Sequence, residues 1–155
     1  MMDLKIERAS LDSTEAVALI EALNRELSER YPEEGATHFR LDPDEVAPGR
    51  GGFLIAYVDG APVGCGALRR LEKREAEIKR MYVIASRRNQ GIARALLEAL
   101  EQLAQSLNAK RLVLETGVRQ PEALDVYRRA GFVTIPPFGE YVDSPLSVCM
   151  AKDLG

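Results

Sequence analysis

The sequence predicts a single α/β (α+β) domain, residues 1–155, built on a mixed sheet. Strand-like runs alternate with amphipathic helical runs along the whole chain. Two apolar runs, 53–58 and 62–68, flank an Asp-Gly dipeptide at 59–60, the pattern of a β-hairpin. Further on, a strand-like run turns through a glycine into a helix and then a strand. Hairpins beside strand-helix-strand units indicate a sheet with both antiparallel and parallel neighbours.

Before the hairpin, the chain is predicted to form one strand and one long helix. Residues 4–8 alternate in polarity and predict a strand. Asp12 or Ser13 is a suitable N-cap for the helix that follows. Its apolar face consists of Ala16, Leu19, Ile20, Leu23 and Leu27. Segment 31–52 is richer in Pro, Gly and Asp, and only a short helix near 42–46 is expected there.

After the hairpin, the predicted order is strand, helix, strand, helix and two strands. The strands cover 76–84, 111–116, 132–135 and 146–151. The first helix carries apolar residues at Ile92, Leu96, Leu100, Leu103 and Leu107. The second begins after Gln120 with Pro121 at its first position and ends at Gly131. The complete order is β-α-(α)-β-β-β-α-β-α-β-β.

Composition restricts the functional classes. A net charge of −3 and a pI of about 5.3 argue against a nucleic-acid partner. No apolar run is long enough to span a membrane and no leader pattern is seen, so a cytoplasmic protein is expected. Cys65 and Cys149 lie in apolar runs and are expected to be small buried residues. With His38 the only histidine, no metal site is expected.

The turn at residues 88–93 carries the strongest chemical signal. A helix that starts at a glycine turn leaves backbone N–H groups unpaired, at the positive end of the helix dipole. Gly91 lets a phosphate approach the backbone, and Arg88 adds positive charge. The turn lacks the Gly-Lys-Ser/Thr ending of a P-loop and the full Gly-x-Gly-x-x-Gly of a dinucleotide site. It therefore predicts a pyrophosphate site of another kind.

Two motifs together resemble those of the GNAT N-acetyltransferases, in particular small bacterial members. The first is Arg88-x-x-Gly91-x-Ala93 after its strand, and the second is Tyr127 followed by Gly131-Phe132. The order of elements over residues 3–153 also fits that family. The resemblance implies a GNAT-like, mostly antiparallel sheet. It also implies acetyl-CoA as cosubstrate, without a metal, and acetyl transfer to a primary amine.

The resemblance also implies which residues bind the cosubstrate. The strand before the turn is expected to diverge from its neighbour at Glu115, exposing backbone groups to the pantetheine. Gln120 stands where the family often has Asn. The expected cofactor-binding residues are Met81, Tyr82, Val83, Arg88, Asn89, Gln90, Gly91, Ile92, Ala93, Arg94, Gln120 and Ala123.

Acetyl transfer requires a base, because presenting an alkyl amine in its neutral form at pH 7 costs roughly 4 kcal/mol. Glu77 matches the position of the base glutamate in some protein-acetylating GNAT members. Strand alternation is expected to place Glu77, Lys79, Met81 and Val83 on one side of the sheet. Alternatively, Glu77 forms an ion pair with a neighbouring Arg or Lys.

The leaving thiolate requires an acid, and an oxyanion must be stabilised. Tyr127, at the signature position, is the candidate acid; the alternative is a packing role on its helix. Family members use a backbone amide near residues 81–83 for the oxyanion. Glu115 is either a second acid/base group or, as favoured here, the ion-pair partner of Arg111 or Lys110.

The acceptor is expected to enter near the first helix, segment 31–52 and the loop at 138–143. Mixed charges there favour a small polar or zwitterionic amine, with arginines available for a carboxylate. The polar residues of this region are Tyr31, His38, Arg40, Arg50, Glu140 and Tyr141. A protein N-terminus or a lysine side chain is a subsidiary acceptor. The alternative function is that of a non-catalytic module that binds acyl-CoA. The sequence also allows a homodimer.

Overall fold

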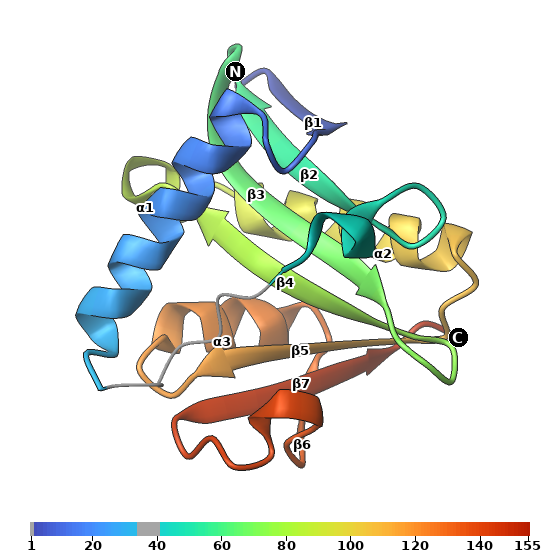
Figure 1. Cartoon of the computed structure of the whole chain (residues 1–155). Helices are drawn as coiled ribbons and strands as arrows, with labels where there is room; N and C mark the ends of the chain where they lie inside the picture. The colour runs from blue at the N-terminus through green and yellow to red at the C-terminus, as the bar shows by residue number, and fades with distance from the viewer. Residues whose placement is uncertain (1, 34–40) are drawn as a thin grey trace.

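A seven-stranded sheet organises the chain, and its strands run in the order β1-β2-β3-β4-β5-β7-β6 (Figure 1). The structure is a computed structural model that describes residues 2–33 and 41–155. The strands are β1 (Leu4–Arg8), β2 (Gly51–Val58), β3 (Ala61–Arg70), β4 (Glu75–Val83), β5 (Arg111–Gly117), β6 (Val133–Ile135) and β7 (Ser147–Asp153). All neighbours are antiparallel except β4 and β5, which confirms the mixed, mostly antiparallel sheet.

Three helices cover the two faces of the sheet (Figure 1). Helix α1 (Thr14–Arg30) packs on one face against the side chains of Phe53 and Ala67. Helices α2 (Ile92–Ser106) and α3 (Pro121–Arg129) pack on the other face, where Leu68 lies. Ala67 and Leu68 are neighbours on β3 but lie on opposite faces of the sheet, because successive side chains of a strand point to opposite sides.

Three short 3-10 turns lie between these elements, and only the first of them, near residues 42–46, was expected. They are η1 (Pro43–Val46), η2 (Ala85–Arg87) and η3 (Gly139–Tyr141). The side chain of Ser13 accepts the backbone N–H of Ala16 and caps α1, one of the two caps expected. Cys65 and Cys149 are both free and buried, as expected. None of the helices in the described ranges combines the length and apolar character needed to span a bilayer.

Strands β4 and β5 are paired only along their first halves. The parallel register joins residues 75–78 of β4 to residues 111–114 of β5 and ends at Ile78 and Leu114. Beyond that point the two strands pair with β3 and β7, respectively, but not with each other. This is the divergence expected at Glu115, and it leaves a V-shaped gap in the middle of the sheet.

A bulge at Arg80 changes which side chains of β4 share a face. Arg80 has a φ of +58°, and the register with β3 shifts between Cys65 and Ala67. As a result Met81 packs toward α2, the same side as Ile78, while Tyr82 packs toward α1. The expectation of one face for residues 77, 79, 81 and 83 is therefore wrong beyond Lys79, because the extra residue reverses the alternation.

Candidate active site

The predicted phosphate turn lines a groove of about 500 Å³. Asn89 and Gly91 both have left-handed backbone, with φ of +62° and +82°. Gly91 is the N-cap of α2, and a Cβ built on it would meet no atom within 4 Å. The turn therefore presents an open helix N-terminus, the arrangement that suits a phosphate.

The groove collects nearly all of the predicted cofactor-binding residues in one place. Only Gln90 of that set is not part of its lining. The expected residues that do line it are Met81, Tyr82, Val83, Arg88, Asn89, Gly91, Ile92, Ala93, Arg94, Gln120 and Ala123. Residues from β4, the turn, α2 and the start of α3 thus meet along a single surface.

Arg88 is fixed in place by three contacts. Its Nε donates to the carbonyl oxygen of Val83 over 2.8 Å, and Nη2 lies 2.7 Å from Oε1 of Glu26 on α1. The guanidinium also lies 5.6 Å from the ring centroid of Tyr82. Arg88 therefore ties α1 to the phosphate turn as well as supplying charge beside it.

Gln120 supports the turn that leads into α3. Its Oε1 accepts the backbone N–H of Gly117 at 3.0 Å and lies 3.4 Å from the hydroxyl of Tyr31. The same hydroxyl accepts the backbone N–H of Arg119 at 2.8 Å. A Cβ on Gly117 would lie 1.7 Å from that oxygen, so only glycine allows Tyr31 to approach so closely.

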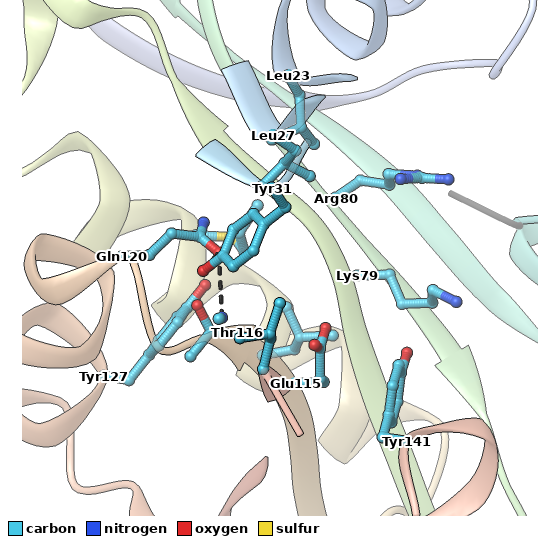
Figure 2. A pocket seen from close by; sticks show the side chains of 14 residues that line it. Leu23, Leu27, Tyr31, Lys79, Arg80, Glu115, Thr116, Gln120, Tyr127 and Tyr141 are labelled. Atoms are coloured by element: carbon cyan, nitrogen blue, oxygen red, sulfur yellow. Dashed lines mark hydrogen bonds between the residues drawn. The ribbon is translucent and has the colours of Figure 1, made fainter. Parts of the chain in front are cut away.

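A second, smaller pocket of about 90 Å³ lies in the gap between β4 and β5 (Figure 2). Helix α1 contributes Leu23, Leu27 and Tyr31 to it. The sheet and the loop before β7 contribute Ile78, Lys79, Arg80, Met81, Glu115, Thr116, Gly117, Tyr141 and Leu146. The divergence of the two strands therefore creates a polar pocket inside the domain.

Tyr127 lies where the groove and the pocket meet. It lines both of them, and its residue is only 7% exposed. Its ring packs edge-on against Phe132, with centroids 5.9 Å apart. Burial, with the nearby charge of Glu115, raises the pKa of its hydroxyl. The packing role and a chemical role are thus both open to this residue.

Glu115 points into the pocket, and it does not form the ion pair with Arg111 that the sequence favours. Arg111 contacts Glu75 and Asp153 instead. Oε2 of Glu115 accepts a hydrogen bond from Oγ of Ser147 at 2.6 Å. Burial raises the pKa of Glu115 to about 7, although the Ser147 hydroxyl and Lys79 act in the opposite direction. A carboxyl group that titrates near neutrality is suited to proton transfer.

Glu77 is fully buried and is not part of the pocket lining. Oε1 accepts hydrogen bonds from Arg69, with Nε at 2.8 Å and Nη2 at 2.7 Å. Oε2 accepts the hydroxyl of Tyr141 at 2.7 Å. Arg69 also contacts Glu45 of η1. Glu77 is therefore the centre of a network that joins η1, β3, β4 and η3, which matches its ion-pair alternative.

The expected acceptor region is divided by the structure. Tyr31 and Tyr141 line the pocket, and Glu140 lies beside it, with its Oε1 3.8 Å from Nζ of Lys79. Arg50 is exposed and lines neither the groove nor the pocket. His38 and Arg40, also expected there, lie outside the described residues.

The sequence reasoning did not assign Lys79 to the pocket. Its Nζ is buried and, in the described part of the chain, makes no hydrogen bond. Burial lowers the pKa of this ammonium group, against the opposing charge of Glu77. The sequence carried no distinct signal for this residue, because β4 also holds Glu75, Glu77 and Arg80, and the point where β4 and β5 cease to pair is set by the tertiary structure.

Comparison with known proteins places this site in a family. The model of the acetyltransferase (GNAT) family matches residues 16–132. The chain belongs to the GNAT acetyltransferases. An IAA acetyltransferase from Azospirillum brasilense is 39% identical over 155 residues, covering 99% of this chain and 100% of that protein. The resemblance stated from the two motifs is confirmed.

Solved GNAT structures share the fold. A Klebsiella pneumoniae protein described as an acyl-CoA N-acyltransferase superposes with a TM-score of 0.85 at 33% identity, covering 98% of each chain. A Bacillus subtilis acetyltransferase solved in complex with CoA has a TM-score of 0.68 at 17% identity, covering 97% of this chain and 99% of that one. This GNAT protein is an enzyme that transfers acetyl groups. Within its described residues, no group of His, Cys, Asp and Glu side chains could hold a metal ion.

Proposed function

We propose that this GNAT enzyme transfers an acetyl group from acetyl-CoA to a primary amine of a small molecule or amino acid. One observation carries the proposal: Tyr127 lines both the groove at the phosphate turn and the pocket between β4 and β5. A thioester placed along the groove would reach its acceptor at that junction. Transfer by direct attack of the amine on the thioester then needs no acetyl-enzyme intermediate.

The groove suits the pyrophosphate and pantetheine of acetyl-CoA. The open helix N-terminus at Gly91 offers unpaired N–H groups to the phosphates, with Arg88 beside them. Backbone groups of β4 beyond Ile78 have no partner on β5 and can bind the pantetheine amides. The Bacillus subtilis acetyltransferase, which has the same fold and was solved with CoA, supports this assignment.

Glu115 is better suited than Glu77 to accept the proton of the amine. It lines the pocket, whereas both carboxylate oxygens of Glu77 are engaged by Arg69 and Tyr141. With a pKa of about 7, Glu115 is substantially ionised at neutral pH and close to the optimum for a general base. The neutral amine then attacks the thioester carbonyl.

The remaining protons go to the sulfur and to solvent. A backbone amide of residues 81–83, next to the bulge at Arg80, stabilises the oxyanion of the tetrahedral intermediate. When the C–S bond breaks, Tyr127 donates its proton to the thiolate and recovers one from the nitrogen as the amide forms. The net products are an N-acetylated amine, CoA thiol and one proton, which leaves through Glu115.

A thiol-release assay tests this function. Purified enzyme is mixed with acetyl-CoA and a panel of small amines, amino acids, IAA and lysine-containing peptides, and CoA thiol is measured for each. IAA is included because of the name of the Azospirillum relative. We expect release that depends on a small amine, with the acetylated product seen by mass spectrometry. Tight acetyl-CoA binding without release for any acceptor would instead favour a non-catalytic module.

A further inference from the structure

The geometry points to Lys79 as a carboxylate-binding residue that makes this enzyme selective for amino acids over simple amines. This inference rests on the proposed function, because it assigns the part of the acceptor that lies beside the reacting amine. It concerns a residue for which neither the family motifs nor the chemistry of acetyl transfer requires a charge.

Lys79 is a buried cation that lacks a hydrogen-bond acceptor. The residue is 8% exposed, and within the described ranges its Nζ makes no hydrogen bond. The carboxylate of Glu140 lies 3.8 Å away, beyond hydrogen-bond distance. Burying a polar group without partners is costly, and more so for a charged group. Since Lys79 lines the pocket, an acceptor carboxylate placed there would satisfy it.

Lys79 and the proposed base, Glu115, occupy equivalent positions on neighbouring strands. Ile78 and Leu114 are the last paired residues of β4 and β5, so Lys79 and Glu115 are the first residue on each strand beyond that pair. Both side chains line the same small pocket (Figure 2). No ion pair joins them in the part of the chain that the structure describes, so each remains available to a ligand.

A cation and a carboxylate that line one pocket from two neighbouring strands match a zwitterion. The ammonium group of an amino acid would face Glu115, where it loses its proton, and its carboxylate would face Lys79. The neighbouring charges are compatible with this arrangement. Glu77 is neutralised by Arg69, and Arg80, from the same strand, adds a second positive charge to the pocket lining. The charges of Glu77 and Glu140 favour the protonated form of Lys79, against the burial that lowers its pKa.

The test compares amino acids with their decarboxylated counterparts, such as alanine with ethylamine, in wild type and in Lys79→Met. Methionine keeps the length of the side chain and removes the charge. For wild type we expect kcat/KM to favour the amino acid. In Lys79→Met we expect kcat/KM for the amino acid to fall about 10- to 100-fold, the value of a hydrogen bond to a charged group, while that for the amine changes little. Lys5→Met, an exposed change on β1, is the matched control.

A second role for Lys79 gives a different result. If Lys79 served only to keep Glu115 ionised, its removal would raise the pKa of Glu115 and lower the rate for both acceptors. That effect would disappear at about pH 8.5, above the pKa of the base. A loss confined to the carboxylated acceptor and persisting at that pH supports the inference. A wild type without preference for amino acids, or a preference that survives Lys79→Met, overturns it.

Binding measurements keep the two proposals separable. The affinity of the enzyme–CoA complex for alanine and for ethylamine is measured by calorimetry, which requires no turnover. Weaker alanine binding in Lys79→Met, with unchanged acetyl-CoA affinity and melting temperature, supports the subsite even if no transfer is detected. In that case the proposed acetyl transfer to amines would fail while the carboxylate site stands. Equal alanine affinity in both proteins overturns the subsite.

Discussion

The hydroxyl of Tyr141 donates a 2.7 Å hydrogen bond to Oε2 of Glu77, and Arg69 occupies the other oxygen of the same carboxylate. This arrangement joins the loop before β7 to the centre of β4. It also raises the pKa of the Tyr141 hydroxyl, since the phenol is buried beside a negative charge. Glu77 therefore has the environment of a structural ion pair, whereas Glu115, which lies on β5 just beyond the paired residues, has that of a base.

Glu77→Gln should cost stability more than chemistry. Replacing Glu77 removes the buried partner of Arg69, which keeps only its contact with Glu45, so we expect the free energy of unfolding to fall by about 2–3 kcal/mol. Chemical denaturation followed by circular dichroism measures this loss. Tyr141→Phe, which keeps the ring and removes the hydroxyl that donates to this carboxylate, should cost about 1.5–3 kcal/mol. A Glu77→Gln enzyme with normal stability and no turnover would return the base to Glu77.

Glu115→Gln should remove the acidic limb of the pH–rate profile. In wild type, kcat/KM is expected to rise with pH and to level off above about 7, because the base must be ionised. The variant should be slower by about 10²- to 10⁴-fold and lose this dependence. Initial rates at saturating acetyl-CoA across the pH range measure both effects. A profile in Glu115→Gln with an unchanged midpoint would exclude Glu115 as the titrating group.

The same substitution should stabilise the protein at alkaline pH. The folded-state pKa of Glu115, about 7, is above its ordinary value of 4.5, so folding favours the protonated form. The contribution of this carboxyl to stability is therefore complete below pH 4.5 and is lost as the pH rises through 7. Relative to wild type, we expect Glu115→Gln to gain roughly 1–3 kcal/mol between pH 5 and pH 8. Urea titrations at the two pH values check it; an equal difference at both would contradict the shift.

Tyr127→Phe separates the acid role from the packing role. Phenylalanine keeps the ring contact with Phe132 and removes only the proton, so acetyl-CoA affinity and melting temperature should change little. Turnover should fall about 10²- to 10⁴-fold. Steady-state kinetics together with calorimetric titration of acetyl-CoA measure the two effects. Tyr57→Phe, on β2 outside both the groove and the pocket, is the control, and equal turnover in the two variants would leave Tyr127 a packing residue.

Gly91→Val tests the phosphate turn. A valine there has strained left-handed backbone, and its side chain projects into the space proposed for the phosphates. We expect the dissociation constant of acetyl-CoA to rise about tenfold or more, the loss of at least one hydrogen bond to a charged group. Gly60→Val in the β2–β3 turn is a close control, since its φ of +84° and open surroundings match those of Gly91. Similar affinities in the two variants would contradict the turn as the phosphate site.

The order of elements could be predicted because its signals are local. The apolar spacing at Leu96 and Leu100, the proline at 121 and the Asp59-Gly60 turn act within a few residues, and each element formed where expected. The groove at Gly91 was predictable for the same reason. Its donors come from one turn and one helix start, which the sequence encodes contiguously.

The roles of the charged residues depended on contacts between distant segments. The sequence alone set Glu77 on β4, but Arg69 on β3 and Tyr141 on η3 decide that its carboxylate is engaged. Likewise, strand alternation holds only until the bulge at Arg80, which arises where β3 and β4 shift register. The sequence by itself determined the elements and the phosphate turn, because short-range backbone preferences fix them. Only the tertiary structure decided that Lys79 and Glu115 face one pocket, because that depends on where β4 and β5 cease to pair.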